Sequence, residues 1–294
     1  MLTVAFLGLG AIGRPIAKRI AIAGFPLTVW NRTSVRAAAF ALEHKARQAR
    51  TPGEAVNDAD VVITCLSTSA DVEQVIDGGV LHALKSGATL LDCTSGDPAT
   101  SRRIAEKVAA KSVGFVDAPV SGGVRGAEDG TLTVMCGGEV KDVDRVRPVI
   151  EAFGKKIVHC GPVGAGDAVK AMNQALLAIT IWGTGEALVA LSKSGVSAHL
   201  ALEVINASSG RSNASMNLFP ERVLTRAFPR TFRLALLDKD ARIAAQIARD
   251  ERVPAPLTQI AADLCTLARK ELGEEADHVE AVKVIEQWAG AEIR

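Results

Sequence analysis

The sequence predicts an α/β domain, built on a mostly parallel and doubly wound sheet, followed by an all-α domain. Its 294 residues exceed the usual size of a single core. Short β-rich runs alternate with helical stretches as far as Cys160, and the strand pattern stops after Gly161. We therefore predict domains at residues 1–161 and 162–294, joined by a long interdomain helix that starts in the glycine-rich segment 161–166.

Seven β-rich runs predict the strands of the first domain, and Ala- and Leu-rich stretches predict the helices of the second. The strands are expected at residues 4–7, 27–30, 61–65, 89–92, 114–117, 131–136 and 157–160. Their alternation with helical stretches indicates a parallel sheet covered by helices. Apolar residues with helical spacing predict helices at residues 165–194, 200–208, 236–251, 256–272 and 278–289.

Composition and charge favour a small-molecule enzyme in the cytoplasm. The 34 Lys and Arg residues nearly balance the 33 Asp and Glu residues, so no strong field attracts nucleic acid or an anionic membrane. Five cysteines, an odd number without a CxxC pair, indicate reduced thiols, and no metal site is predicted. The most apolar window, residues 171–190, contains Asn173, Gln174 and Glu186, which favours a buried helix over a membrane span.

A GLGAIG segment after the first strand predicts a dinucleotide site. In this context its first glycine permits the turn, its second lets the backbone approach a pyrophosphate, and its third allows close packing of helix and strand. The following helix, expected at residues 11–23, directs its N-terminal amides at the anion. The alternative is a tight turn without a ligand. The predicted cofactor residues here are Gly8, Leu9, Gly10, Ala11, Ile12 and Gly13.

The end of the second strand favours NADP over NAD. An NAD site normally has an acidic residue about 20 residues beyond the glycines, where it accepts from the ribose hydroxyls. This chain has Asn31, Arg32 and Thr33 there. Asn and Thr can donate to a 2′-phosphate and Arg can pair with it. The alternative is that Arg32 is a solvated loop charge.

The absence of tyrosine excludes a Tyr phenol as the proton donor, and Lys170 is the leading candidate instead. A lysine serves as an acid or base when burial or a neighbouring cation lowers its pKa. Asn173 and Gln174 follow at i+3 and i+4, on the same helix face, in an otherwise apolar AVKAMNQALLAI segment. The alternative is an ordinary solvated lysine.

Two further groups follow predicted strands, at the edge where open α/β sheets bind ligands. Ser121, Gly122 and Gly123 offer a hydroxyl and backbone amides that could hold a substrate carboxylate, although a simple turn is an equal alternative. Thr94 and Ser95 could line the nicotinamide ribose, and a helix-capping role is the alternative for them.

Over nearly its whole length the chain resembles the β-hydroxyacid dehydrogenase family. The similarity lies in FLGLGAIG from Phe6, DAPVSGGVRGAEDGTL from Asp117, GPVGAGDAVKAMNQ from Gly161 and the Lys239-Asp240 pair. The stretch INASSGRSN from Ile205 makes it most similar to bacterial members that act on 3-hydroxyisobutyrate.

The resemblance implies a role for each motif. Lys170 would be the catalytic acid/base, and Ser121, Gly122 and Gly123 would bind the substrate carboxylate. Asn173 and Gln174 would flank the reacting groups, and Gln174 stands where many members have Asn, which leaves the substrate size open. Lys239 would close the site and contact the cofactor, as would Leu66, Thr94 and Ser95. Subunits would associate through the helical domain into a dimer or tetramer.

The resulting prediction is an oxidoreductase that transfers a hydride between NADP(H) and a small 3-hydroxy acid or its semialdehyde. A 3-hydroxyisobutyrate dehydrogenase-like activity is favoured. Tartronate semialdehyde, glyoxylate and succinic semialdehyde reduction remain alternatives, because one or two side chains decide selectivity among small acids. An alternative of another class is a non-catalytic NADP-binding redox regulator.

Overall fold

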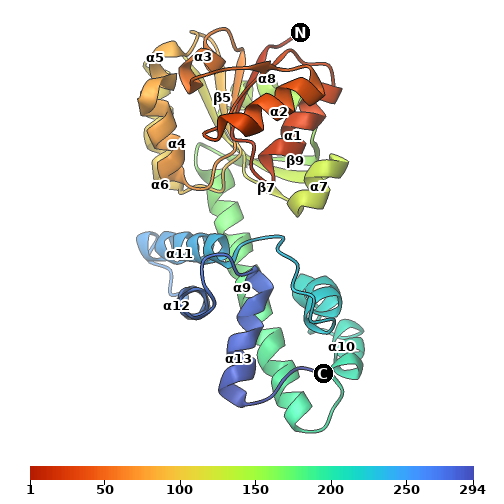
Figure 1. Ribbon diagram of the computed structural model, residues 1–294. Coiled ribbons are helices and arrows are strands. Elements are labelled where there is room, and N and C mark those ends of the chain that lie inside the picture. Colours follow the sequence, from red (N-terminus) through yellow and green to blue (C-terminus); the bar gives the residue numbers. More distant parts are fainter. The chain divides into compact units, whose positions relative to one another are not determined.

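The computed structural model describes all 294 residues, which form two compact units. Unit 1 comprises Met1–Lys170 and unit 2 comprises Ala171–Arg294 (Figure 1). Helix α9 (Ala165–Lys193) begins in unit 1 and continues into unit 2. The expected fold class, a Rossmann-like domain followed by an all-helical domain, is confirmed.

Unit 1 is built on one sheet with the strand order β3-β2-β1-β4-β5-β6-β8-β7, and β9 pairs with β8. The first six strands in this order are parallel, whereas β8 runs antiparallel to β6 and β7. The sequence 3-2-1-4-5-6 is the Rossmann order. The strands are β1 (Val4–Leu7), β2 (Leu27–Trp30), β3 (Arg47–Gln48), β4 (Val61–Thr64), β5 (Thr89–Asp92), β6 (Gly114–Asp117), β7 (Val120–Ser121), β8 (Leu132–Gly138) and β9 (Gly154–Gly161).

Helices cover both faces of this sheet. Residues of α1, α2, α7 and α8 share one apolar core with the strands, and residues of α3, α4 and α6 share a second core on the other face. Side chains alternate between these cores along β1, where Phe6 belongs to the first core and Leu7 to the second. The helices are α1 (Gly13–Ile22), α2 (Ser34–His44), α3 (Pro52–Val56), α4 (Ser69–Val75), η1 (Ile76–Val80), α5 (Leu81–Ala83), α6 (Pro98–Ala109), α7 (Gly123–Asp129) and α8 (Val140–Ile150).

Unit 2 is helical throughout. It contains most of α9, followed by α10 (Ala198–Asn206), the π-helical segment η2 (Ala214–Val223), α11 (Leu234–Asp250), α12 (Pro256–Leu272), η3 (His278–Ala281) and α13 (Val282–Ala289). Helix α9 is long and apolar enough to cross a membrane by length and composition, a test that the core helix of a soluble protein also passes.

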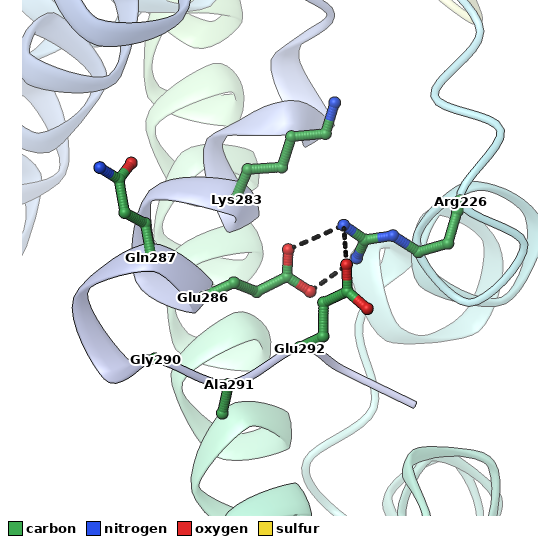
Figure 2. Close-up of a pocket in the computed structure, with 7 residues that line it drawn as sticks. All are labelled: Arg226, Lys283, Glu286, Gln287, Gly290, Ala291 and Glu292. Carbon is green, nitrogen blue, oxygen red and sulfur yellow. Dashed lines mark hydrogen bonds and ion pairs between the residues drawn. The ribbon is translucent and has the colours of Figure 1, made fainter.

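The end of unit 2 folds back on its own helices beside a cavity of about 390 Å³ (Figure 2). Arg226 donates to both carboxylate oxygens of Glu286, at 2.6 and 3.0 Å, and lies 3.6 Å from Glu292. The backbone N–H of Ile293 donates to the same Glu286 carboxylate, which holds the Ile293 side chain in the core. None of the predicted site residues lines this cavity.

Candidate active site

The GLGAIG loop connects β1 to α1, and the structure shows why positions 8 and 13 are glycine. Gly8 has a φ of +109°, which side chains rarely tolerate, and an added Cβ would overlap the carbonyl oxygen of Cys65. A Cβ on Gly13 would overlap the carbonyl oxygen of Gly8, so the loop and helix can approach closely only with glycine here. An added Cβ on Gly10 would meet nothing within 4 Å, so this part of the loop is open to a ligand.

Helix α1 begins at Gly13, two positions later than the predicted residue 11, and has no capping side chain or acidic residue in its first turn. Pro15 has no N–H, and the N–H groups of Arg14 and Ile16 already donate to the carbonyls of Gly10 and Ile12. The amides left for an anion are therefore those of Gly13 and the loop before it, and no carboxylate opposes one. An open glycine loop before an uncapped helix fits a dinucleotide pyrophosphate.

The three residues after β2 differ in what their side chains do. The Asn31 side chain accepts from the backbone N–H of Leu9 at 2.9 Å and donates to the carbonyl of Thr33 at 3.0 Å, so it fixes the glycine loop to β2. Arg32 has an 89% exposed side chain, 4.0 Å from Asp71. Thr33 precedes α2, whose first turn contains no acidic residue. Arg36, in that exposed first turn, is a second cation that the sequence analysis did not single out.

The loops after β4 and β5 are joined by hydrogen bonds. The N–H of Leu66 donates to the hydroxyl of Thr94 at 3.0 Å, and the N–H of Thr94 donates to Asp92 at 3.0 Å. The Leu66 side chain lies beside Gly8, against the space that a Cβ would need. Asp97 caps α6 through the N–H of Thr100, so neither Thr94 nor Ser95 has the alternative capping role.

Ser121 ends the short strand β7, and Gly122 and Gly123 lead from it into α7. The φ angles of the two glycines are +132° and +64°, and both residues are exposed. Two consecutive positive φ values require glycine and turn the backbone sharply at the end of the strand. This exposed stretch of backbone can approach a ligand without interference from side chains.

Asp117, at the end of β6, fixes the start of α9. Its carboxylate accepts from the backbone N–H of Gly164 at 2.7 Å and from that of Asp167 at 2.9 Å. Two N–H groups that have no partner within the helix are thereby satisfied by a charge of the favourable sign. Lys170 stands one turn further along α9 and is only 7% exposed. The alternative of a fully solvated lysine is not what the structure shows.

The carboxyl groups of Asp117 and Asp167 lie in a buried region rich in acids. Burial raises the pKa of Asp117 from 3.8 to about 6, and the nearby Asp92 adds to the rise. Burial, followed by the charges of Asp117 and Asp92, raises the pKa of Asp167 well above its ordinary value. This region therefore retains a proton on a carboxyl group under mildly acidic conditions.

All five cysteines are free, and none is suited to nucleophilic catalysis. Burial raises the pKa of Cys65, Cys136 and Cys265 to about 12, so these thiols remain protonated near neutral pH. Because the thiolate is the nucleophilic form, thiol chemistry is not indicated.

In unit 2 the structure brings Gln174 and Lys239 to one carboxylate. The side-chain amide of Gln174 donates to Asp240 Oδ2 at 3.3 Å, and Lys239 Nζ lies 3.0 Å from Asp240 Oδ1. Asn173 donates to the Gln174 carbonyl oxygen at 3.3 Å. Asp240 is 2% exposed, and nothing in the sequence assigns it a role although it stands beside Lys239.

The Rossmann strand order and the glycine loop define a dinucleotide-binding protein, and comparison with known proteins identifies it as a nicotinamide-dependent dehydrogenase. Residues 3–161 match the family model of the NAD binding domain of 6-phosphogluconate dehydrogenase. Residues 164–285 match the model described as NAD-binding of NADP-dependent 3-hydroxyisobutyrate dehydrogenase. The chain is 36% identical to 2-(hydroxymethyl)glutarate dehydrogenase of Eubacterium barkeri, over 99% of this chain and 97% of that protein.

A second relative and a solved structure agree. The chain is 33% identical to the NAD-dependent L-serine dehydrogenase of Pseudomonas aeruginosa, over 99% of this chain and 100% of the relative. The Mycobacterium tuberculosis 3-hydroxyisobutyrate dehydrogenase with L-serine has a TM-score of 0.89, at 32% identity over 97% of this chain and 99% of that one. The chain belongs to the β-hydroxyacid dehydrogenase family. It is an NAD(P)-dependent oxidoreductase that acts on the CH–OH group of a small hydroxy acid, so the non-catalytic alternative is not retained.

Proposed function

We propose that this protein oxidises the primary alcohol of a small 3-hydroxy acid with NADP⁺, and reduces the corresponding semialdehyde with NADPH. The supporting observation is the buried Lys170, one turn beyond the Asp117 anchor of α9. The strand that ends at Asp117 leads directly to the exposed Ser121-Gly122-Gly123 backbone.

The substrate class follows from what the relatives' names have in common. The acids 3-hydroxyisobutyrate, L-serine and 2-(hydroxymethyl)glutarate all have a carboxylate, a CH₂OH group and a variable substituent on the carbon between them. We favour 3-hydroxyisobutyrate, and L-serine is the second candidate because it accompanies the similar solved structure. Tartronate, glyoxylate and succinic semialdehydes complete the panel to be measured.

The residues proposed to bind the cofactor fit a dinucleotide, which when bound would accept or supply the hydride. The open backbone at Gly10 and the uncapped start of α1 would hold the pyrophosphate. Leu66, Thr94 and Ser95 would contact the nicotinamide end. Asn31 holds the loop in place for this, and Arg32 and Thr33 would contact the 2′-phosphate.

Lys170 would move the proton of the reaction. In the oxidation, its neutral amine accepts the hydroxyl proton as the carbon loses its hydride, and in the reduction its ammonium returns that proton to the aldehyde oxygen. The Ser121 hydroxyl and the amides of Gly122 and Gly123 would bind the substrate carboxylate. From unit 2, Asn173 and Gln174 are proposed to orient the reacting groups, and Lys239 to close the site and contact the cofactor.

Replacing Lys170 tests the assignment of the acid/base. We expect Lys170→Ala to lower kcat by about 10²- to 10⁴-fold, the usual effect of removing a general acid or base, with dinucleotide binding retained. Steady-state rates for each acid of the panel and NADPH fluorescence titration measure the two quantities. Lys155→Ala, an exposed lysine on β9, is the matched control. Near-normal kcat in Lys170→Ala would refute the assignment.

The NADP preference depends on Arg32. We expect wild-type kcat/KM to be at least about 10-fold higher with NADP⁺ than with NAD⁺, because one charge-assisted pair contributes on the order of 1.5–3 kcal/mol. Arg32→Ala should remove most of this ratio by lowering only the NADP⁺ value, whereas the exposed Arg50→Ala should leave it unchanged. Equal use of both cofactors by the wild type would contradict the proposal.

We also propose that residues 1–161 bind the cofactor and that residues 162–294 serve the substrate and subunit association, in a cytoplasmic homo-oligomer. Unit 2 supports association because it exposes many large apolar side chains, which often mark protein interfaces. These are Leu176, Leu200, Val204, Met216, Val253, Leu257, Ile260 and Trp288. Light scattering on the purified protein would measure whether the mass exceeds that of one 30.7 kDa chain.

A further inference from the structure

Asp167 is an acidic side chain that the proposed reaction does not use and that is 1% exposed. It lies in the first turn of α9, three residues before Lys170. Its Oδ1 accepts from the backbone N–H of Gly96 at 3.0 Å, and its Oδ2 lies 2.6 Å from the Ser101 hydroxyl. Its own backbone N–H donates to Asp117 at 2.9 Å.

These three contacts join parts of unit 1 that are distant in the sequence. Gly96 belongs to the loop after β5, directly after Thr94 and Ser95, and is 71 residues from Asp167. Ser101 lies on α6, and Asp117 ends the strand that leads to the exposed glycines. One buried residue therefore connects the proposed nicotinamide loop, the strand before the proposed carboxylate site and the helix that carries Lys170.

The hydrogen-bond partners of the two acids indicate where their proton resides. Asp117 accepts from two backbone N–H groups at the positive end of α9, which favours its ionised form. Asp167 accepts from only one N–H, and the serine hydroxyl can act as donor or acceptor. In the structure Ser101 donates to Asp167 Oδ2. When Asp167 is protonated, the serine hydroxyl turns and accepts instead, and Gly96 still donates to Oδ1.

We propose that Asp167 is a positioning residue for the reaction, because its carboxyl group ties the loop after β5 to the first turn of α9 and thereby fixes Lys170 relative to that loop. This inference rests on the proposed function, in which Lys170 transfers the proton. Residues at i and i+3 lie on the same helix face, so a shift of the first turn moves Lys170 with it. Misplacement of a catalytic group by about 1 Å can cost about 100-fold in rate.

The test separates chemistry from cofactor binding. We expect Asp167→Ala to lower kcat by about 10- to 100-fold. The dissociation constant of NADPH, from fluorescence titration of the variant without substrate, should change by less than about 3-fold because the glycine loop is untouched. Asp167→Asn keeps an acceptor for Gly96 and a donor for Ser101, so it should restore kcat to within about 3-fold of wild type.

Two controls exclude a general loss of stability and a failure of the proposed function. Ile104→Ala opens a cavity beneath the same helix α6 without touching these hydrogen bonds, and should lower the melting temperature while preserving kcat. If Asp167→Ala does not fold, Ser101→Ala removes one partner and should lower kcat by about 3- to 10-fold. Wild-type kcat in both Asp167→Ala and Ser101→Ala would overturn the inference. A loss of kcat in Ile104→Ala equal to that in Asp167→Ala would overturn it as well. A Lys170→Ala variant with normal kcat would instead refute the proposed function itself.

Discussion

Asp167 in unit 1 and Asp277 in unit 2 are equally removed from water, with exposed fractions of 1% and 0%, yet their pKa values move in opposite directions. Burial and two neighbouring acids raise the pKa of Asp167. Burial also opposes ionisation of Asp277, but the hydrogen bond and charge of His278, together with backbone amides, hold its pKa below the ordinary value. The partners of each carboxyl group decide the difference, because burial is common to both.

The partners of Asp277 are numerous and of the favourable sign. Its Oδ2 accepts from the backbone N–H groups of Thr231 and Phe232, at 2.8 and 3.0 Å. Its Oδ1 accepts from the N–H of Val279 and lies 3.0 Å from His278 Nδ1 and 3.7 Å from Arg222. His278 Nδ1 also faces the carbonyl of Phe232, and because both neighbours are acceptors this nitrogen must carry the hydrogen.

Asp117 and Asp167 have no cation among the causes that shift their pKa values. A cluster of this kind reduces stability near neutral pH, and such clusters are frequent at sites that move protons. Asp277 instead joins the segment before α11 to the start of η3 and serves to hold unit 2 together. The comparison therefore distinguishes a carboxyl pair placed beside the proposed chemistry from a carboxylate placed for stability.

The largest effect that would test this contrast is expected from Asp277→Ala. The variant leaves the amides of Thr231, Phe232 and Val279 without their acceptor and Arg222 without its buried partner. Removing one member of a buried, hydrogen-bonded charge group costs about 3–5 kcal/mol. Urea unfolding monitored by tryptophan fluorescence measures this loss, since Trp182 and Trp288 are stacked within unit 2.

A matched substitution in the same unit gives the control for Asp277→Ala. Asp263 is exposed on α12 and accepts only from Gln259, so Asp263→Ala should cost about 0.5 kcal/mol or less. The kcat per folded molecule of Asp277→Ala should stay near that of the wild type. Equal losses of stability in the two variants would break the contrast, because the partners of Asp277 would then contribute nothing measurable.

The sequence predicts the fold well where apolar runs are bounded by turns, as in β1, β2, β5 and β6, whose limits agree with the structure. It gave no indication of β3 or β7, because each is a two-residue strand without a buried apolar pattern. The helical segment η2 was also missed, since Pro220 interrupts a helical pattern.

The candidate site divides in the same way. The GLGAIG and Ser121-Gly122-Gly123 segments are continuous motifs, so their backbone requirements are visible in the sequence. The connection of Asp167 to Gly96 spans 71 residues and that of Gln174 to Asp240 spans 66, so neither is visible in local patterns. Asp167 stands inside a motif that the sequence analysis quoted, yet only its tertiary partners give it a role.

A smaller effect that would sharpen the contrast is the pH dependence of unit 1. Folding raises the pKa of Asp117 from 3.8 to about 6, so between these values the folded state binds more protons than the unfolded state. Stability from this group is therefore lost as the pH rises through that window. Asp277 has the opposite sign, because its stabilising contribution is present above about 3.8 and is lost as the pH falls.

Asp117→Asn removes this titration, and because the charge of Asp117 also raises the pKa of Asp167, the variant lowers that pKa too, a change of the same sign. The asparagine side chain has one acceptor oxygen fewer for the start of α9, which lowers stability by the same amount at every pH. The Asp117 titration itself is absent. Relative to the wild type, the variant should therefore gain about 1–3 kcal/mol of unfolding free energy between pH 4 and pH 7, from about two pKa units at about 1.4 kcal/mol each.

The measurement uses the fluorescence of Trp30, which reports on unit 1 when Trp182→Phe and Trp288→Phe remove the other two tryptophans. Asp58→Asn, at an exposed acid of the same unit, is the matched control. Parallel curves for Asp117→Asn and the wild type would show that the Asp117 carboxyl keeps its ordinary pKa, and the distinction between the two units would then rest on Asp277 alone.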